Sequence, residues 1–236
     1  MRNALTIAGR EFRLYFVSPI AYAILTAFLV VNGFLFWLIL SSTREASLRD
    51  LFANMGVVFL FLSPALTMRL LSEEQRSGTI ELLLSAPVRD AEVVLGKFLG
   101  GFGFLLVMLG VTLYYPLLLF VLGSPDPGPI ATGYLGMALM ATAFMSIGLL
   151  ASSLTQNQIV AAVVSLMALL LLWVLGAASS FVGPELGGVL QYLGLSGHID
   201  GFQRGVIDSR DVAYFVSLVI VCLFTTVRML ETRRWA

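Results

Sequence analysis

Five long stretches of this chain contain no Asp, Glu, Lys or Arg, and they constrain its fold more than any other feature. They lie at 14–43, 51–68, 98–125, 127–184 and 212–227. A charged side chain at the centre of a bilayer costs roughly 2.5 kcal/mol or more, so membrane spans avoid such residues. Because a transmembrane helix needs about 20 apolar residues, each of the first three stretches supplies one span.

The stretch at 127–184 is long enough for two spans and must fold back once. Its most polar interior part, 152–158, marks the turn. The last stretch is short, but it reaches Leu230 if the Arg228 side chain extends to the interface. A composition of 58% hydrophobic and 12% charged residues agrees with a membrane protein. We therefore predict an all-α membrane protein with six transmembrane helices at 19–40, 51–71, 97–122, 131–152, 159–181 and 212–230.

The distribution of basic residues predicts the orientation of these spans. An even number of spans places both termini on one side of the membrane. That side receives ten of the 14 Lys and Arg residues, and the other side receives four. Because basic residues are enriched in cytoplasmic segments, we expect both termini in the cytoplasm.

The first 18 residues are expected to form a helix that lies in the membrane interface. Apolar side chains alternate there with Arg2, Arg10 and Arg13, and Pro19 allows a bend into the first span. A cleaved signal peptide is disfavoured because the apolar run that follows is too long.

The largest predicted cytoplasmic segment, 72–96, joins the second and third spans. Ser72 followed by Gln75 fits a capping box, which predicts that a helix begins at Ser72. Gly78 is expected to break this helix, and 80–84 form a short apolar helix under the membrane. Such a segment suits the transmission of force from a cytoplasmic partner. The alternative is a solvated loop whose leucines rest on lipid.

The predicted outer side has two turns and one longer region. The turns are a polar one at 41–50 and a Pro/Gly-rich one at 123–129, for which we expect no regular structure. The longer region, 182–211, is rich in glycine, and 186–195 is too short to cross the bilayer. We expect re-entrant or interfacial outer helices there, which either line an exit path or cover the surface.

The residues that an active site needs are sparse. The chain has one His and one Cys, so the pair His198 and Asp200 lacks a third metal ligand, and Cys222 forms no disulfide framework. The single lysine, Lys97, does not follow the glycine-rich pattern of a phosphate-binding loop. We predict no catalytic residue, no metal site and no cofactor bound by this chain. ATP and Mg²⁺ would bind to a partner.

The predicted spans carry few polar groups. Asn32 is the clearest one, and we expect it to hydrogen-bond between helices. Gly96, Gly100 and Gly103 give the third span a small-residue face for close helix packing. No Asp or Glu lies at the centre of a span, which disfavours an ion relay.

A transporter powered by a separate ATPase fits these constraints best. The alternatives are an ATPase-linked membrane anchor that moves no substrate, and an ATP-independent transporter or channel. Equal numbers of basic and acidic residues, 14 of each, give no support for nucleic-acid binding.

Several sequence blocks resemble the ABC-2 type permeases of ABC transporters, and within them the gliding-motility-associated permease family. The most specific blocks are LSPALTMR at 62–69 and EEQRSGTIELLLSAPV at 73–88. Similar blocks are FVSPIAY at 16–22, SIGLLASSLTQNQ at 146–158 and FQRGVIDSRD at 202–211. The resemblance covers almost the whole chain, 1–236, as a single transmembrane domain.

This resemblance implies a permease, expected to be an exporter in the bacterial inner membrane, that pairs with a second permease subunit or forms a homodimer. It also implies a cytoplasmic ATPase partner and, as a further partner, a membrane protein with a large periplasmic domain. The segment between the second and third spans corresponds to the helix that couples the two components. The residues that match it are Glu73, Glu74, Arg76, Ser77, Gly78, Thr79 and Glu81.

Overall fold

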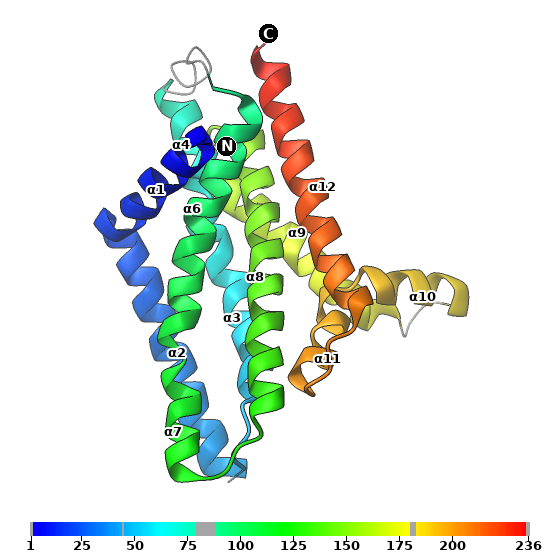
Figure 1. Ribbon diagram of the computed structural model, residues 1–236. Helices are drawn as coiled ribbons and strands as arrows, with labels where there is room; N and C mark the ends of the chain where they lie inside the picture. The colour runs from blue at the N-terminus through cyan, green and yellow to red at the C-terminus, as the bar shows by residue number, and fades with distance from the viewer. Residues whose placement is uncertain (1, 44, 79–87, 180–182, 235–236) are drawn as a thin grey trace.

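The computed structural model describes residues 2–43, 45–78, 88–179 and 183–234, and in these ranges it is helical without a strand (Figure 1). Six of its helices are long and apolar enough to cross a membrane, which confirms the predicted fold class. They are formed by α2 (Pro19–Thr43), α3 (Arg49–Thr67) with α4 (Arg69–Ser77), α6 (Asp90–Val111) with α7 (Tyr114–Leu122), α8 (Pro127–Leu154), α9 (Gln158–Ala178) and α12 (Ser209–Arg234).

The two ends of the chain lie at the same end of the helical bundle (Figure 1). We call this the terminal end and the other the distal end. Large apolar side chains remain exposed along α2, α9 and α12, among them Trp37, Met167 and Phe224. Such surfaces are suited to contact with lipid or with another membrane helix.

Helix α8 lies at the centre of the bundle and is the most buried of the six spans. It packs against α3, α6, α9 and α12, and its inward side chains include Met137, Met140 and Phe144. Gly133 and Gly136 admit the rings of Phe52 and Phe202 where a Cβ atom would collide with them. Helix α8 thereby positions α4 and α6, which contribute to the site below.

Helix α1 (Arg2–Val17) precedes the first span and crosses α6, and the chain turns sharply between Val17 and Pro19 (Figure 1). The predicted small-residue face of α6 receives it. A Cβ atom at Gly100 would lie 2.5 Å from the Cβ atom of Glu11, and one at Gly96 would lie 2.7 Å from that of Ile7. The glycines therefore allow α1 and α6 to approach closely.

Two of the spans are interrupted, and α8 supplies a hydroxyl group at each interruption. Pro116 has no N–H to donate to the Thr112 carbonyl, and the third span is interrupted one turn before it, where α6 ends at Val111 and α7 begins at Tyr114. The Tyr134 hydroxyl donates to that carbonyl at 2.8 Å. Between α3 and α4, the Ser152 hydroxyl donates to the Met68 carbonyl at 2.9 Å.

The connections differ from the prediction at one point. Helix α8 begins at Pro127, with Asp126 as its N-cap accepting a hydrogen bond from Gly128 N at 3.0 Å. The expectation of no regular structure over 123–129 is therefore wrong for its second half, because proline is favoured in the first turn of a helix. The turn at 152–158 is confirmed, since α8 ends at Leu154 and Asn157 caps α9.

The expected interhelical role of Asn32 is also wrong. Its side chain is fully buried, and its Nδ2 donates to the Phe28 carbonyl of its own helix at 2.7 Å. A short polar side chain reaches the carbonyl one turn earlier more easily than a neighbouring helix.

Between α9 and α12 the chain forms α10 (Pro184–Leu193), the 3₁₀ helix η2 (Leu195–His198) and α11 (Asp200–Gln203). Helix α10 lies across the direction of the spans and projects from the side of the bundle (Figure 1). Along the length of the bundle, α10 lies between the terminal end and the distal end (Figure 1). Helix α11 rests on α8, where Thr132 Oγ1 donates to the Phe202 carbonyl at 2.6 Å.

Candidate coupling site

Helix α4 carries the residues that the sequence singles out for coupling. The predicted break at Gly78 is confirmed, because Gly78 has a φ of 70° and is the C-cap of α4. Only glycine adopts this left-handed conformation without strain. Glu73, Arg76 and Ser77 are exposed on the last turns of the helix. The structure thus ends the second span in a polar tip.

The predicted capping box at Ser72 is wrong. Helix α4 begins at Arg69, so Ser72 lies within it, and its hydroxyl donates to the Met68 carbonyl one turn earlier. A different serine performs the capping role. Ser152 Oγ accepts hydrogen bonds from the backbone N–H groups of Leu71 and Ser72, each at 3.0 Å. The first turn of α4 is therefore capped by α8.

A second contact fixes α4 to the end of α8. Gln75 is buried, and its Nε2 donates to the Ser153 carbonyl at 3.0 Å. Together with the Ser152 bonds, this contact holds one face of α4 against the last turn of the central helix. A displacement of α4 must consequently move α8 or break these bonds.

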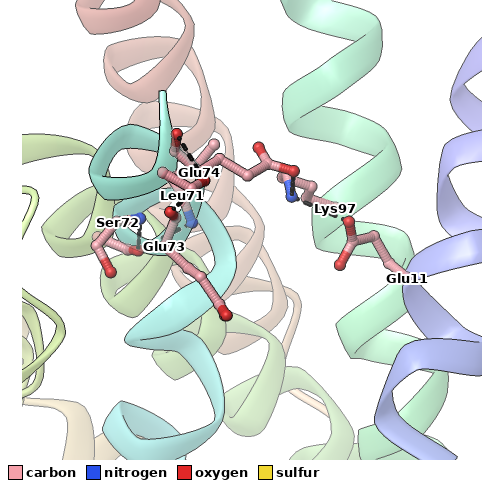
Figure 2. Close-up of polar contacts among 8 residues, drawn as sticks. Glu11, Leu71, Ser72, Glu73, Glu74 and Lys97 are labelled. Atoms are coloured by element: carbon pink, nitrogen blue, oxygen red, sulfur yellow. Dashed lines mark hydrogen bonds and ion pairs between the residues drawn. The ribbon is translucent and has the colours of Figure 1, made fainter. Parts of the chain in front are cut away.

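Helix α4 also contributes Glu74 to a buried group of charged side chains. We call this group, formed by Glu11, Glu74 and Lys97, the Lys97 cluster. Lys97 Nζ lies 3.0 Å from Glu11 Oε1 and 2.8 Å from Glu74 Oε1. Lys97 is 2% exposed and Glu11 is 9% exposed. Figure 2 shows the ammonium group between the two carboxylates, whereas the Glu73 side chain points away.

The Lys97 cluster joins three helices by electrostatic attraction. Glu11 comes from α1, Glu74 from α4 and Lys97 from α6. Removal of charged groups from water costs several kcal/mol per ion, and the attraction offsets this cost only while all partners are present. The cluster therefore favours one arrangement of α1, α4 and α6 over looser alternatives.

The junction between α1 and α2 is fixed to the same end of the second span. Tyr15 donates a hydrogen bond to the Leu66 carbonyl at 3.0 Å, and Arg69 donates one to Ser18 Oγ at 2.8 Å. The Arg69 guanidinium also lies 5.6 Å from the centre of the Tyr15 ring. Burial raises the pKa of the Tyr15 hydroxyl far above its usual range, and the nearby charge of Arg69 lowers it by less.

The structure separates the predicted coupling residues into two groups. Glu74 faces inward to Lys97, whereas Glu73, Arg76 and Ser77 face outward. Thr79, Glu81 and the predicted helix at 80–84 lie outside the described residues.

Sequence reasoning missed the inward partners of α4, namely Glu11, Lys97, Ser152 and Ser153. Glu11 and Lys97 stand 86 positions apart, so no local pattern connects them. The composition nevertheless marked Lys97 as unusual. Lys97 is the single lysine of the chain, and it stands at the edge of a long uncharged stretch.

The pair of His198 and Asp200 is not formed. His198 instead lies against Asp211, with 2.7 Å between Nδ1 and Oδ1. Among the residues that the structure describes, no group of three His, Cys, Asp or Glu side chains is placed to hold a metal ion.

Comparison with known proteins identifies the family of the chain. No curated protein matches the chain. The family model described as "ABC-2 family transporter protein" matches residues 51–192, which include all but the first two residues of α3, the whole of α4, Lys97, and Ser152 and Ser153 of α8. Members of this family are membrane subunits that pair with a cytoplasmic ABC ATPase. With six membrane-spanning helices and a family match over more than half of its length, the chain belongs to the ABC-2 family of transporter proteins and is a multi-pass membrane subunit of an ABC transporter.

Proposed function

We propose that this chain is the permease of an ABC exporter and that α4, continued by Thr79 and Glu81, is the segment through which a separate ATPase drives it. The Lys97 cluster is the observation that carries this proposal. It joins the exposed tip of the second span to α1 and to α6 through buried charges.

The tip of α4 is suited to a soluble protein partner. Glu73 and Arg76 present charges of both signs, and Ser77 adds a hydroxyl group, on the part of the helix that points away from the bundle. Exposed polar groups favour contact with a protein surface or with water over contact with lipid tails. Glu74 is part of the buried side and holds the tip in place.

A push on α4 reaches the bundle along two routes. One runs through Ser152 and Gln75 to α8, the central helix. The other runs through Glu74 and Lys97 to α6 and α1. Packed helices move as discrete bodies, so movement of α4 would shift these neighbours together.

The remaining parts of the proposal follow from the sequence. The terminal end faces the cytoplasm of a bacterial cell, with α1 in the interface of the inner membrane. ATP and Mg²⁺ bind to the partner ATPase, and this chain pairs with a second copy or a second permease. The sequence blocks quoted above support the gliding-motility-associated branch of the family, with a periplasmic-domain protein as a further partner.

Photocrosslinking tests the contact directly. Benzoylphenylalanine placed at position 76 or 73 should crosslink in cells to a protein that mass spectrometry identifies as an ABC ATPase. The same residue at position 49, which is exposed at the distal end, is the control and should not capture it. Failure of both α4 positions to crosslink to an ATPase would refute the assignment of α4.

Transport is then separated from anchoring by reconstitution with that ATPase. Arg76→Glu reverses an exposed charge and should reduce the ATPase activity stimulated by the permease by about tenfold, while the unfolding temperature stays unchanged. Glu74→Arg is a poorer test of docking, because it would place a second cation beside Lys97. ATP-dependent movement of material into sealed vesicles would establish an exporter, and ATPase binding without movement would establish an anchor.

A further inference from the structure

A contact between His198 and Asp211 fastens the segment between α9 and the last span to the start of that span. We call residues 184–203 the outer segment, comprising α10, η2 and α11. Its α11 end rests on α8 through Thr132. Its α10 end projects from the bundle (Figure 1), and the contacts at the end of α10 gather around His198.

His198 makes two hydrogen bonds with opposite sides of its ring. Nδ1 lies 2.7 Å from Asp211 Oδ1 at the start of α12. Nε2 lies 2.8 Å from the Tyr192 carbonyl oxygen near the end of α10. A carbonyl oxygen only accepts hydrogen bonds, so Nε2 must carry a proton, and an ionised carboxylate also only accepts. The two bonds together require a proton on each ring nitrogen.

The surroundings of the ring favour a cation. The Tyr214 ring stacks on it with 3.9 Å between centroids and 16° between planes. Two neutral rings avoid a face-to-face arrangement, whereas a cation is attracted to the face of an aromatic ring. The ring also lies at the C-terminus of α10, where unpaired carbonyl groups and the helix dipole attract positive charge.

The other ionisable groups around the ring do not compete for this role. Asp211 and Tyr214 face it from α12, and Tyr192 faces it from α10. Helix α9, which packs against η2, carries no ionisable side chain. Tyr214 already donates its proton to the Leu193 carbonyl at 2.7 Å. Asp211 is thus the group that balances a charge on His198.

We infer that His198 is a doubly protonated imidazolium paired with Asp211, and that this pair is the latch that holds the outer segment against the first turn of the last span. Its opening would loosen the end of α10, which still packs against α9, while α11 stays fixed on α8. A cavity of about 300 Å³ borders the latch, lined by Gly188, Gln191, Tyr192, Gly197, His198 and Asp211, so water has access to the pair. The inference does not depend on the ATPase contact proposed above.

Because the chain has one histidine, nitrogen NMR can test the charge without assignment. The protein is labelled with ¹⁵N-histidine, purified without a histidine tag and measured in lipid nanodiscs at pH 7. Both ring nitrogens should resonate as protonated. In Asp211→Asn, the amide can donate to Nδ1, so one nitrogen should become unprotonated. An unprotonated nitrogen in the unaltered protein, or two protonated nitrogens in Asp211→Asn, would overturn the ion pair.

Hydrogen exchange tests the latch. In His198→Ala, amide exchange over 186–203 should accelerate by about tenfold or more relative to the unaltered protein, while exchange in α8 stays unchanged. Ser217→Ala is the matched control, because Ser217 Oγ donates to the Tyr214 carbonyl within α12. Equal exchange over 186–203 in His198→Ala and Ser217→Ala would show that the pair is no latch.

Discussion

The Lys97 cluster and the His198–Asp211 pair hold different kinds of structure in place. The Lys97 cluster connects α1, α4 and α6, and its Lys97 and Glu11 are 86 positions apart. The His198–Asp211 pair connects residues 13 positions apart and fastens a side segment to one span. The cluster fixes the relative position of long helices, and the pair fixes a local attachment. Loss of the cluster should therefore weaken the whole bundle, whereas loss of the pair should loosen one part.

The strongest test of this difference is Lys97→Met. Met has a similar length but leaves the carboxylates of Glu11 and Glu74 without their cation. We expect a loss of about 3–5 kcal/mol, equivalent to a fall of about 10 °C in Tm. Thermal unfolding in nanodiscs measures it, with Arg10→Met as a control because Arg10 is exposed on α1. His198→Ala should lower Tm by less.

The triple variant Glu11→Leu, Lys97→Met and Glu74→Leu identifies the cause of that loss. If the unpaired charges are responsible, removal of all three should recover most of the lost Tm. A triple variant no more stable than Lys97→Met would show that the cost comes from packing.

Gly100→Ala tests whether the Lys97 cluster depends on close packing of α1 against α6. The added methyl group would lie 2.5 Å from Glu11 Cβ and 2.9 Å from the Ala8 carbonyl oxygen. We expect α1 to be displaced, with a loss of about 1–3 kcal/mol and faster hydrogen exchange over residues 2–17. Gly110→Ala is the control on the same helix, since no atom lies within 4 Å of its Cβ position. Equal exchange in the two variants would contradict the packing argument.

The smallest effect is expected at an exposed ion pair. Arg228 and Glu231 lie 2.8 Å apart on α12, with 64% and 39% of their side chains exposed. Glu231→Gln should change the free energy of unfolding by less than about 0.5 kcal/mol, because water and salt screen such a pair. If Glu231→Gln lowered the free energy of unfolding as much as Lys97→Met does, the contribution of an ion pair would depend on pairing and not on burial.

The sequence predicted the spans well and their polar contacts poorly, for one physical reason. Long uncharged stretches report directly on the bilayer, so six spans were recognisable without any knowledge of packing. Hydrogen bonds depend on which helices become neighbours. Ser72 matched a local capping pattern, yet Ser152 caps α4 from a helix 80 positions away. His198 was weighed with Asp200, two positions on, although its partner is Asp211.

Local signals succeeded where the backbone itself decided the outcome. Gly78 ends α4 because its conformation suits glycine, and the polar turn predicted at 152–158 lies where α8 ends and Asn157 caps α9. The same kind of rule misled at Pro127, which was assigned to a turn but begins α8. A sequence does not distinguish a proline in the turn before a helix from a proline in the first turn of the helix until the N-cap residue is identified. Here the N-cap residue is Asp126.

The hydroxyl groups that α8 provides also bear on how the protein is made. A chain is synthesised from its N-terminus, so the second and third spans leave the ribosome before α8 is complete. Until Ser152 follows, the N–H groups of Leu71 and Ser72 lack the hydroxyl oxygen that accepts from them, in a medium where missing hydrogen bonds are costly. We expect chains halted before Ser152 to hold the second span insecurely in the membrane. The fourth span would then be the step of biogenesis that makes this earlier insertion permanent.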